Sequence, residues 1–175
     1  MVEGLPETNK PYGFDMNDES TFRVVIPGPP QSWQRPRFAG RSRRVYSPSS
    51  LEVWYDAAAL AIWPLWSKST PLSGPLRIVV DAVTARPKSL PAALKSCGWS
   101  AARWRATPGR VARPTTPDVD NFAKAALDAL QGDPAKRRPV VIHDDRSVVE
   151  LVARKWYAAE GEDPSMIIEV WEVEL

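Results

Sequence analysis

Four aspartates and one lysine, in two short segments, are the residues of this 175-residue chain best suited to carry chemistry. Asp118 and Asp120 stand one residue apart at the start of an expected helix, and Lys124 follows one helical turn later. Asp144 and Asp145 form a doublet beside an expected strand. Clustered carboxylates repel one another unless a cation lies between them. Mg²⁺ suits such a place because it takes oxygen ligands and usually keeps several waters.

One or two Mg²⁺ ions held in this way would activate water and stabilise the leaving oxygen of a phosphodiester. Lys124 could then offset charge on the phosphorus centre or orient the nucleophile. An Asp-x-Asp pair alone is a weak signal, because capping and turn formation explain most such pairs. Together with Asn121, Lys124 and the doublet it is a stronger one. His143 could act as a general base, although a surface histidine without a role is the simpler interpretation, and Asp128 is expected to be an exposed partner of Lys124.

The element that must position the first segment is a helix expected from about residue 120 to 130. Asp118 or Asp120 would cap it, and Gln131 to Pro134 would end it. Its apolar residues recur with helical spacing and predict a buried stripe, made by Phe122, Ala126, Leu127 and Leu130. The doublet would lie between a short strand over 140–142 and a longer one over 147–157.

The remaining elements predict an α+β domain, with a mixed sheet and two main helices packed on it. Strands are expected over 22–26, 76–84 and 166–173, and a second helix from Ser49 or Ser50 to Ile62. Residues 33–46 are expected to form a basic loop or loose hairpin. Residues 86–116 read mostly as a loop, with a short helix near 90–96 as an alternative for part of it.

Composition indicates one folded domain over residues 21–175, preceded by a flexible acidic tail over 1–20. The chain is 43% hydrophobic and contains eight tryptophans, which argues against disorder. Cys97 is alone, so no internal disulfide can form, and this fits a reducing cytoplasm. The sequence contains no apolar run of membrane-spanning length and no signal-peptide pattern, so we expect a cytoplasmic location.

Charge is distributed unevenly along the chain, although the net value is only +2. Both ends are acidic, and there is no acid between Asp81 and Asp118. A basic middle indicates contact with nucleic acid phosphates, whereas any single arginine is better explained as solvated surface. Three tryptophans interleave with the arginines and could stack on bases or complete a core, namely Trp33, Trp99 and Trp104. The predicted DNA contacts are Arg35, Arg37, Arg41, Arg43, Arg44, Lys88, Arg103, Arg105, Arg110 and Arg113.

At the acidic segments the chain resembles the RusA family of Holliday junction resolvases, which occurs in bacteria and their prophages. The likeness covers roughly residues 22–157 and is specific in its central third. In places the chain departs from the family pattern, with Thr116 where a lysine often stands, Arg146 after the doublet, and a longer connection between Leu130 and Asp144. The residues that carry the resemblance are Pro117-Asp118-Val119-Asp120-Asn121, Lys124, Asp128-Ala129-Leu130 and Asp144-Asp145-Arg146-Ser147-Val148-Val149.

The resemblance implies a Mg²⁺-dependent endodeoxyribonuclease, with Mn²⁺ as a second usable ion, that acts in recombination and repair. Asp118, Asp120 and Asp145 would bind the metal, with Asp144 as a helper, and Lys124 would be the catalytic lysine. The family acts as a homodimer on four-way or other branched DNA and cuts two strands of like polarity symmetrically. A two-fold enzyme matches the symmetry of such a junction.

Two other functions remain open from the sequence. A DNA-binding module could keep the scaffold without cutting, but binding alone gains nothing from carboxylates that face phosphates. A transferase could use Asp-x-Asp to hold Mg²⁺ on a nucleotide diphosphate, but the chain lacks a glycine-rich loop to cradle the phosphates.

Overall fold

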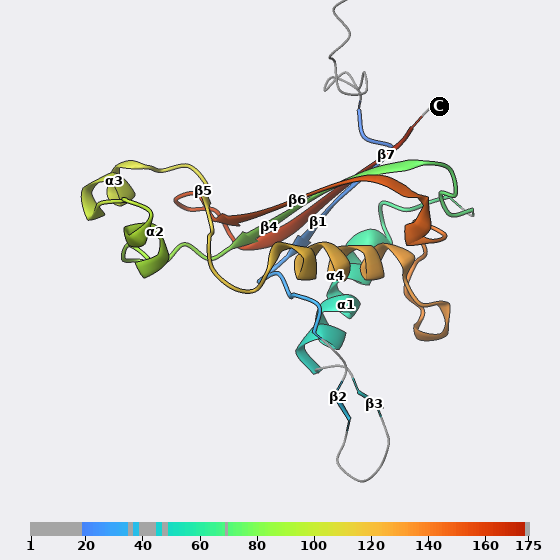
Figure 1. Cartoon of the computed structure of the whole chain (residues 1–175). Helices are drawn as coiled ribbons and strands as arrows, with labels where there is room; N and C mark the ends of the chain where they lie inside the picture. The colour runs from blue at the N-terminus through green and yellow to red at the C-terminus, as the bar shows by residue number, and fades with distance from the viewer. Residues whose placement is uncertain (1–18, 35–36, 39–44, 47–48, 69, 174–175) are drawn as a thin grey trace, which may run out of the picture.

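The computed structural model of the protein describes residues 19–34, 37–38, 45–46, 49–68 and 70–173 (Figure 1). The expected acidic tail therefore lies almost entirely outside the described residues. Four of the predicted DNA contacts also lie outside the described residues, namely Arg35, Arg41, Arg43 and Arg44. For a fifth, Arg37, the structure describes the backbone but not the side chain.

A five-stranded mixed sheet forms the centre of the molecule, with strand order β1-β7-β4-β6-β5. The central strand β4 pairs with β6 in parallel, and the other neighbouring pairs are antiparallel. A mostly apolar strand suits this central place, and β4 is largely buried along its length. The strands span Phe22–Pro27 (β1), Leu76–Thr84 (β4), Val111–Ala112 (β5), Val148–Tyr157 (β6) and Ser165–Glu172 (β7). A separate two-stranded sheet pairs Arg37–Phe38 (β2) with Val45–Tyr46 (β3).

Two helices, α1 (Ser49–Ile62) and α4 (Val119–Gln131), cover one face of the large sheet (Figure 1). Both bury an apolar stripe in the main core, as the sequence predicts, and in α4 the stripe includes Phe122, Ala126 and Leu130. Gly132 ends α4 with φ +61°, and a Cβ there would lie 2.1 Å from the carbonyl oxygen of Pro139. Only glycine therefore allows the chain to turn this sharply after the helix. The α+β fold with a mixed sheet is confirmed.

The segment expected to be mostly loop contains the short helix expected near 90–96 and also a second short helix and a second small core. Helices α2 (Ala92–Ser96) and α3 (Ala101–Ala106) lie at one end of the sheet (Figure 1). The Ser100 hydroxyl caps α3 by accepting a hydrogen bond from the Arg103 N–H. Leu94, Trp104, Val111 and Tyr157 pack together and so give this lobe its own buried centre.

The strand expected over 140–142 is absent, because the backbone there is bonded elsewhere. The N–H groups of Val141 and Ile142 both donate to the carbonyl oxygen of Leu130, and Ile142 forms one isolated bridge with Leu72. This stretch therefore closes the end of α4 instead of extending the sheet. Two 3₁₀ turns, η1 (Pro134–Lys136) and η2 (Asp145–Ser147), complete the connection to β6.

Candidate active site

Asp118 and Asp120 lie at the first turn of α4, and both are exposed. Asp118 is the N-cap residue with an extended backbone, but its side chain makes no capping hydrogen bond. Neither carboxylate has a hydrogen-bond or ion-pair partner among the described residues. The positive end of the helix dipole tolerates negative charge at this position. The two carboxylates therefore present free oxygen atoms at one surface site.

Two cations hold the segment that leads into α4. The Lys155 ammonium, from β6, donates to the carbonyl oxygens of Thr115 and Pro117, each at 2.7 Å. The Arg113 guanidinium donates to the Thr115 hydroxyl at 2.9 Å and to the Thr116 carbonyl oxygen at 2.6 Å. The Thr116–Pro117 peptide is cis. Sequence reasoning missed Lys155, which joins the sheet to the residues just before Asp118.

Lys124 lies one turn after Asp120 and makes no ion pair within the described chain. Its ammonium nitrogen instead lies 3.7 Å from the centroid of the Trp33 ring. A cation–π contact contributes roughly 0.5–1 kcal/mol at an exposed site. An ion pair between helix residues four apart contributes only about 0.2–0.5 kcal/mol. The aromatic ring is therefore the better partner, and the Asp120 carboxylate is left unpaired.

The aspartate doublet has two different environments. Asp144 caps η2 by accepting from the backbone N–H of Arg146 at 2.9 Å, and the Arg146 guanidinium donates to its other oxygen at 2.6 Å. These hydrogen bonds hold the pKa of Asp144 well below its usual range. Asp145, in contrast, is exposed. Asp144 thus shapes the turn, and Asp145 has the more accessible carboxylate.

The sequence predicted that Asp128 is an exposed partner of Lys124, and this prediction is wrong. Asp128 is half-buried, and the hydroxyl of Tyr55 on α1 donates to its carboxylate at 2.9 Å. Burial raises the pKa of Asp128, while the Tyr55 hydrogen bond and the charge of Lys124 oppose the rise. Asp145 contributes a smaller increase through its own negative charge, so the exposed member of the doublet lies near the second half of α4.

The expected ligands therefore do not form one group in this chain. Asp128 lies eight residues beyond Asp120, which is roughly 12 Å along an α-helix, and the doublet lies towards that end (Figure 1). Over the described ranges, no three His, Cys, Asp or Glu side chains gather closely enough to hold a metal ion. Mg²⁺ nevertheless needs only one or two carboxylates when waters and substrate phosphates supply its other ligands. The free Asp118 and Asp120 carboxylates fit an open site of that kind.

Comparison with known proteins decides the family. The endodeoxyribonuclease RusA model matches residues 27–170, which include all the acidic residues discussed above. The chain belongs to the RusA family. It is also similar to the uncharacterized protein YqaN of Bacillus subtilis (strain 168), with 28% identity over 150 residues, 85% of this chain and 96% of that protein. Membership in the RusA family places the chain among endodeoxyribonucleases of the Holliday junction resolvase type.

The basic residues predicted to bind DNA in this RusA-family chain differ in whether they already form ion pairs or hydrogen bonds within the protein. Arg110 makes a two-pronged ion pair with Glu162, and Arg113 holds the segment before α4. Lys88, Arg103 and Arg105 are exposed. The Arg103 guanidinium lies 4.2 Å from the centroid of the Trp99 ring, and it has no acidic partner among the residues that the structure describes.

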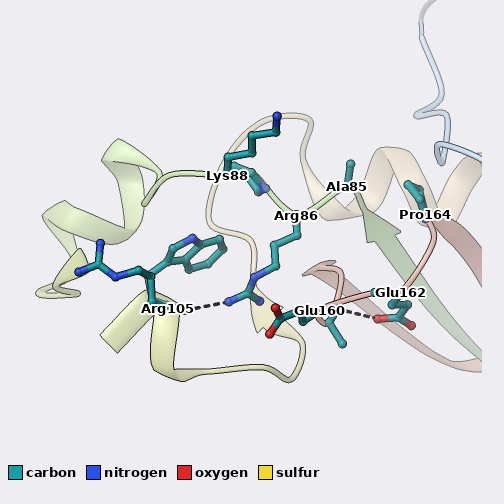
Figure 2. A pocket seen from close by; sticks show the side chains of 11 residues that line it. Ala85, Arg86, Lys88, Arg105, Glu160, Glu162 and Pro164 are labelled. Atoms are coloured by element: carbon teal, nitrogen blue, oxygen red, sulfur yellow. Dashed lines mark hydrogen bonds between the residues drawn. The ribbon is translucent and has the colours of Figure 1, made fainter. Parts of the chain in front are cut away.

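Arg86 joins the helical lobe to the sheet. Figure 2 shows its side chain reaching from the end of β4 toward α3, where it donates to the carbonyl oxygens of Trp104 (2.9 Å) and Thr107 (2.6 Å). Its guanidinium also lies 4.1 Å from the centroid of the Trp104 ring. Beside it is an open hollow of about 640 Å³, lined in part by Lys88, Arg105 and Glu160. Trp104 is thus a core residue and Arg86 a structural one.

None of the described helices is both long and apolar enough to pass through a membrane.

Proposed function

We propose that the chain is a Mg²⁺-dependent endodeoxyribonuclease, able to use Mn²⁺ as well, that resolves four-way DNA junctions by paired nicks during recombination and repair. The supporting observation is the exposed pair Asp118 and Asp120, which has no partner among the described residues and lies one turn before Lys124. An unpaired acidic pair is unfavourable beside DNA unless a cation joins it to the phosphates. The nuclease family of the chain supplies the matching chemistry.

In this proposal Asp118 and Asp120 would supply carboxylate oxygens to the ion, and a phosphate of the bound strand would supply another. A bound Mg²⁺ would lower the pKa of a water molecule and stabilise the leaving oxygen. Lys124 would donate to the phosphate oxygens as negative charge builds up on them. Lys155 and Arg113 would keep the Thr115–Pro117 segment fixed, so that the Asp118 carboxylate does not move away from the phosphate.

Asp145 remains a proposed third ligand, with Asp144 as its helper. Its exposure supports this role, and DNA phosphates and waters would supply the remaining oxygen ligands of the metal. A homodimer would carry two sites, as paired nicks on a two-fold symmetric junction require. We propose that the enzyme works in the cytoplasm of a bacterial or phage-infected cell.

DNA would be held by the exposed cations of the helical lobe, Lys88, Arg103 and Arg105, and by the predicted contacts at Arg35, Arg37, Arg41, Arg43 and Arg44. Arg110 and Arg113 would serve DNA mainly through the elements that they stabilise. Because cations bound to phosphates release counterions, replacing one such cation by a neutral residue should reduce the slope of log affinity against log salt by about 0.9.

A DNA-binding module that does not cut is the second candidate. One observation favours it, namely that the described residues contain no group of three metal-ligating side chains. The unpaired carboxylates at the start of α4 count against it, because without a metal they would repel the phosphates that the arginines attract.

The test is cleavage of an end-labelled synthetic four-way junction and of the matching linear duplex, with Mg²⁺, with Mn²⁺ and with EDTA. We expect metal-dependent paired cuts in the junction and intact duplex. Asp145→Asn should abolish cutting while leaving junction binding in place, and Asp163→Asn, in the β6–β7 connection, is the matched control. A wild-type protein that binds the junction but leaves it uncut with either metal would favour the non-cutting module. Normal cutting by Asp145→Asn would remove that residue alone from the proposed ligands.

A further inference from the structure

The partner of Lys124 is unusual for a lysine between two acidic residues on one helix face. Asp120 precedes it by four residues and Asp128 follows it by four, which is the spacing of helical ion pairs. No ion pair forms with either one in the described structure, and the ammonium lies 3.7 Å from the centroid of the Trp33 ring. Asp128 instead accepts a hydrogen bond from Tyr55.

Trp33 is fixed by the same helix that carries the lysine. Its backbone N–H donates to the carbonyl oxygen of Asn121 at 2.8 Å, in the first turn of α4. Its ring is partly buried against the main core, and the preceding Ser32 is only 9% exposed. The ring therefore has a defined position relative to Asp118, Asp120 and Lys124, although Trp33 lies about ninety residues earlier in the sequence.

We propose that Trp33 is the positioning residue of Lys124, and this inference rests on the proposed nuclease function. An aromatic ring attracts the ammonium without neutralising it, whereas a carboxylate would satisfy its N–H groups and its charge. The contact with Trp33 keeps both the lysine and Asp120 available, the lysine for a phosphate and the carboxylate for a metal. The ring face that Lys124 occupies is also closed to a stacked base, so base stacking is not the role of that face.

The matched pair of variants is Trp33→Phe, which keeps an aromatic face, and Trp33→Leu, which keeps apolar volume without one. Junction cutting by Trp33→Leu should show a kcat reduced roughly tenfold, because a displaced catalytic group costs rate more than binding, while KM stays unchanged. Trp33→Phe should keep most of the wild-type kcat. In a Lys124→Ala background neither change should lower the rate further, since the two residues act as one unit.

A second readout does not depend on cutting. The ε-methylene protons of Lys124 should be shifted upfield in NMR spectra of the wild type and of Trp33→Phe, because they lie close to an aromatic ring, and should lose that shift in Trp33→Leu. Melting temperatures of the variants establish that each is folded, and Trp33→Met replaces Trp33→Leu if the latter does not fold.

Equal kcat values for Trp33→Phe and Trp33→Leu, or an unshifted Lys124 signal in the wild type, would overturn the proposal. If the wild type cuts no branched DNA while the Lys124 signal is shifted as expected, the contact is real but the proposed function has failed. The two failures are thus distinguishable.

Discussion

The two ends of helix α4 differ in how their charges are partnered. At the first turn, Asp118 and Asp120 are exposed and have no partner among the described residues. Around the second half of the helix, Asp128 accepts a hydrogen bond from Tyr55, and Arg138 pairs with Glu52 at 2.9 Å and with Asp56 at 2.7 Å.

We call the second half of α4 the paired end and its first turn the unpaired end. The paired end joins three parts of the chain. Arg138 comes from the connection after α4, its side chain is only 10% exposed, and its guanidinium lies 5.3 Å from the centroid of the Tyr55 ring. Lys136 adds a second ion pair to Glu52 at 3.0 Å. These contacts tie α1, α4 and the connection together, so the residues at this end serve the fold.

The charges at the second half of α4 serve the fold, whereas those at its first turn are the ones to which we assign a ligand. Two carboxylates one residue apart repel each other, and the helix dipole offsets only part of that repulsion. We therefore expect mutations at the first turn of α4 to reduce activity, and mutations at the second half to reduce stability.

The largest effect is expected for Asp118→Asn at the unpaired end. Removing a residue that only orients a metal ligand weakens a metal site roughly 10–100-fold, so removing a proposed ligand should reduce junction cutting by about 100-fold or more. The melting temperature should stay the same or rise slightly, because one of two repelling charges is removed. Single-turnover cutting rates and calorimetry check both statements, and near-normal cutting would contradict the assignment of Asp118.

A smaller loss of activity is expected for Lys155→Met, which removes the support beneath the unpaired end. The carbonyl oxygens of Thr115 and Pro117 lose their donor, and the Asp118 carboxylate loses its fixed position. Misplacement of catalytic groups should reduce kcat roughly tenfold. Arg154→Met is the matched control on the same strand, because Arg154 pairs with Asp81 instead. Equal cutting rates for the two variants would show that Lys155 does not position the site.

At the paired end, Tyr55→Phe should reduce stability without reducing the cutting rate of the folded protein. The variant leaves the half-buried Asp128 carboxylate without its donor, and loss of a hydrogen bond to a charged group costs about 1.5–3 kcal/mol. Tyr157→Phe is the control, because the Tyr157 hydroxyl makes no hydrogen bond within the described part of the chain. Urea denaturation measures the free energy of unfolding of both variants. The loss relative to the wild type should be larger for Tyr55→Phe than for Tyr157→Phe.

The smallest effect is expected in the pH dependence of stability. The hydrogen bond from Arg138 lowers the pKa of Glu52, and that from Arg110 lowers the pKa of Glu162. A carboxyl whose pKa is lowered by folding stabilises the protein above its unfolded pKa, and this contribution is lost as the pH falls through the folded value. Asp128 acts in the opposite direction, because burial raises its pKa and its contribution is lost as the pH rises.

The melting temperature should therefore fall below about pH 4.5, and Glu52→Gln should make the fall shallower. Because Glu52 is partly exposed, solvent screens its ion pairs and the change should be small. Melting curves between pH 3 and pH 7 measure it. A steeper acid fall in Glu52→Gln would contradict the assigned direction.

The sequence predicted well those features that depend on neighbouring residues. The stripe of α4 follows from helical spacing, and the mixed sheet from strongly apolar strands such as β4. Asp118 is the N-cap residue of α4, as one of the two predicted positions, but its side chain makes no capping hydrogen bond. Helix α3 was missed because its short apolar pattern is completed by Trp104 packing on Tyr157, a contact across more than fifty residues.

The contacts that position the residues of the candidate site could not be predicted either, because they join residues that are far apart in the sequence. Trp33 and Lys124, Lys155 and Pro117, and Tyr55 and Asp128 are each joined by folding and not by spacing. The role of Asp128 was misjudged because helical spacing offered Lys124 as a partner, whereas α1 brought a hydroxyl closer. Whether Asp118, Asp120 and Asp145 share a metal stays a prediction.

The most direct test of the contrast between the two ends of α4 compares Asp120→Asn with Asp128→Asn, two changes of the same chemistry on the same face of one helix. The cutting rate of a four-way junction in Mg²⁺ and the melting temperature are measured for each variant. We predict that Asp120→Asn abolishes cutting and keeps the wild-type melting temperature, while Asp128→Asn, which keeps an acceptor oxygen for the Tyr55 hydroxyl, still cuts when folded, with any change confined to the melting temperature. Normal cutting by Asp120→Asn, with Asp128→Asn stable but inactive, would contradict the account.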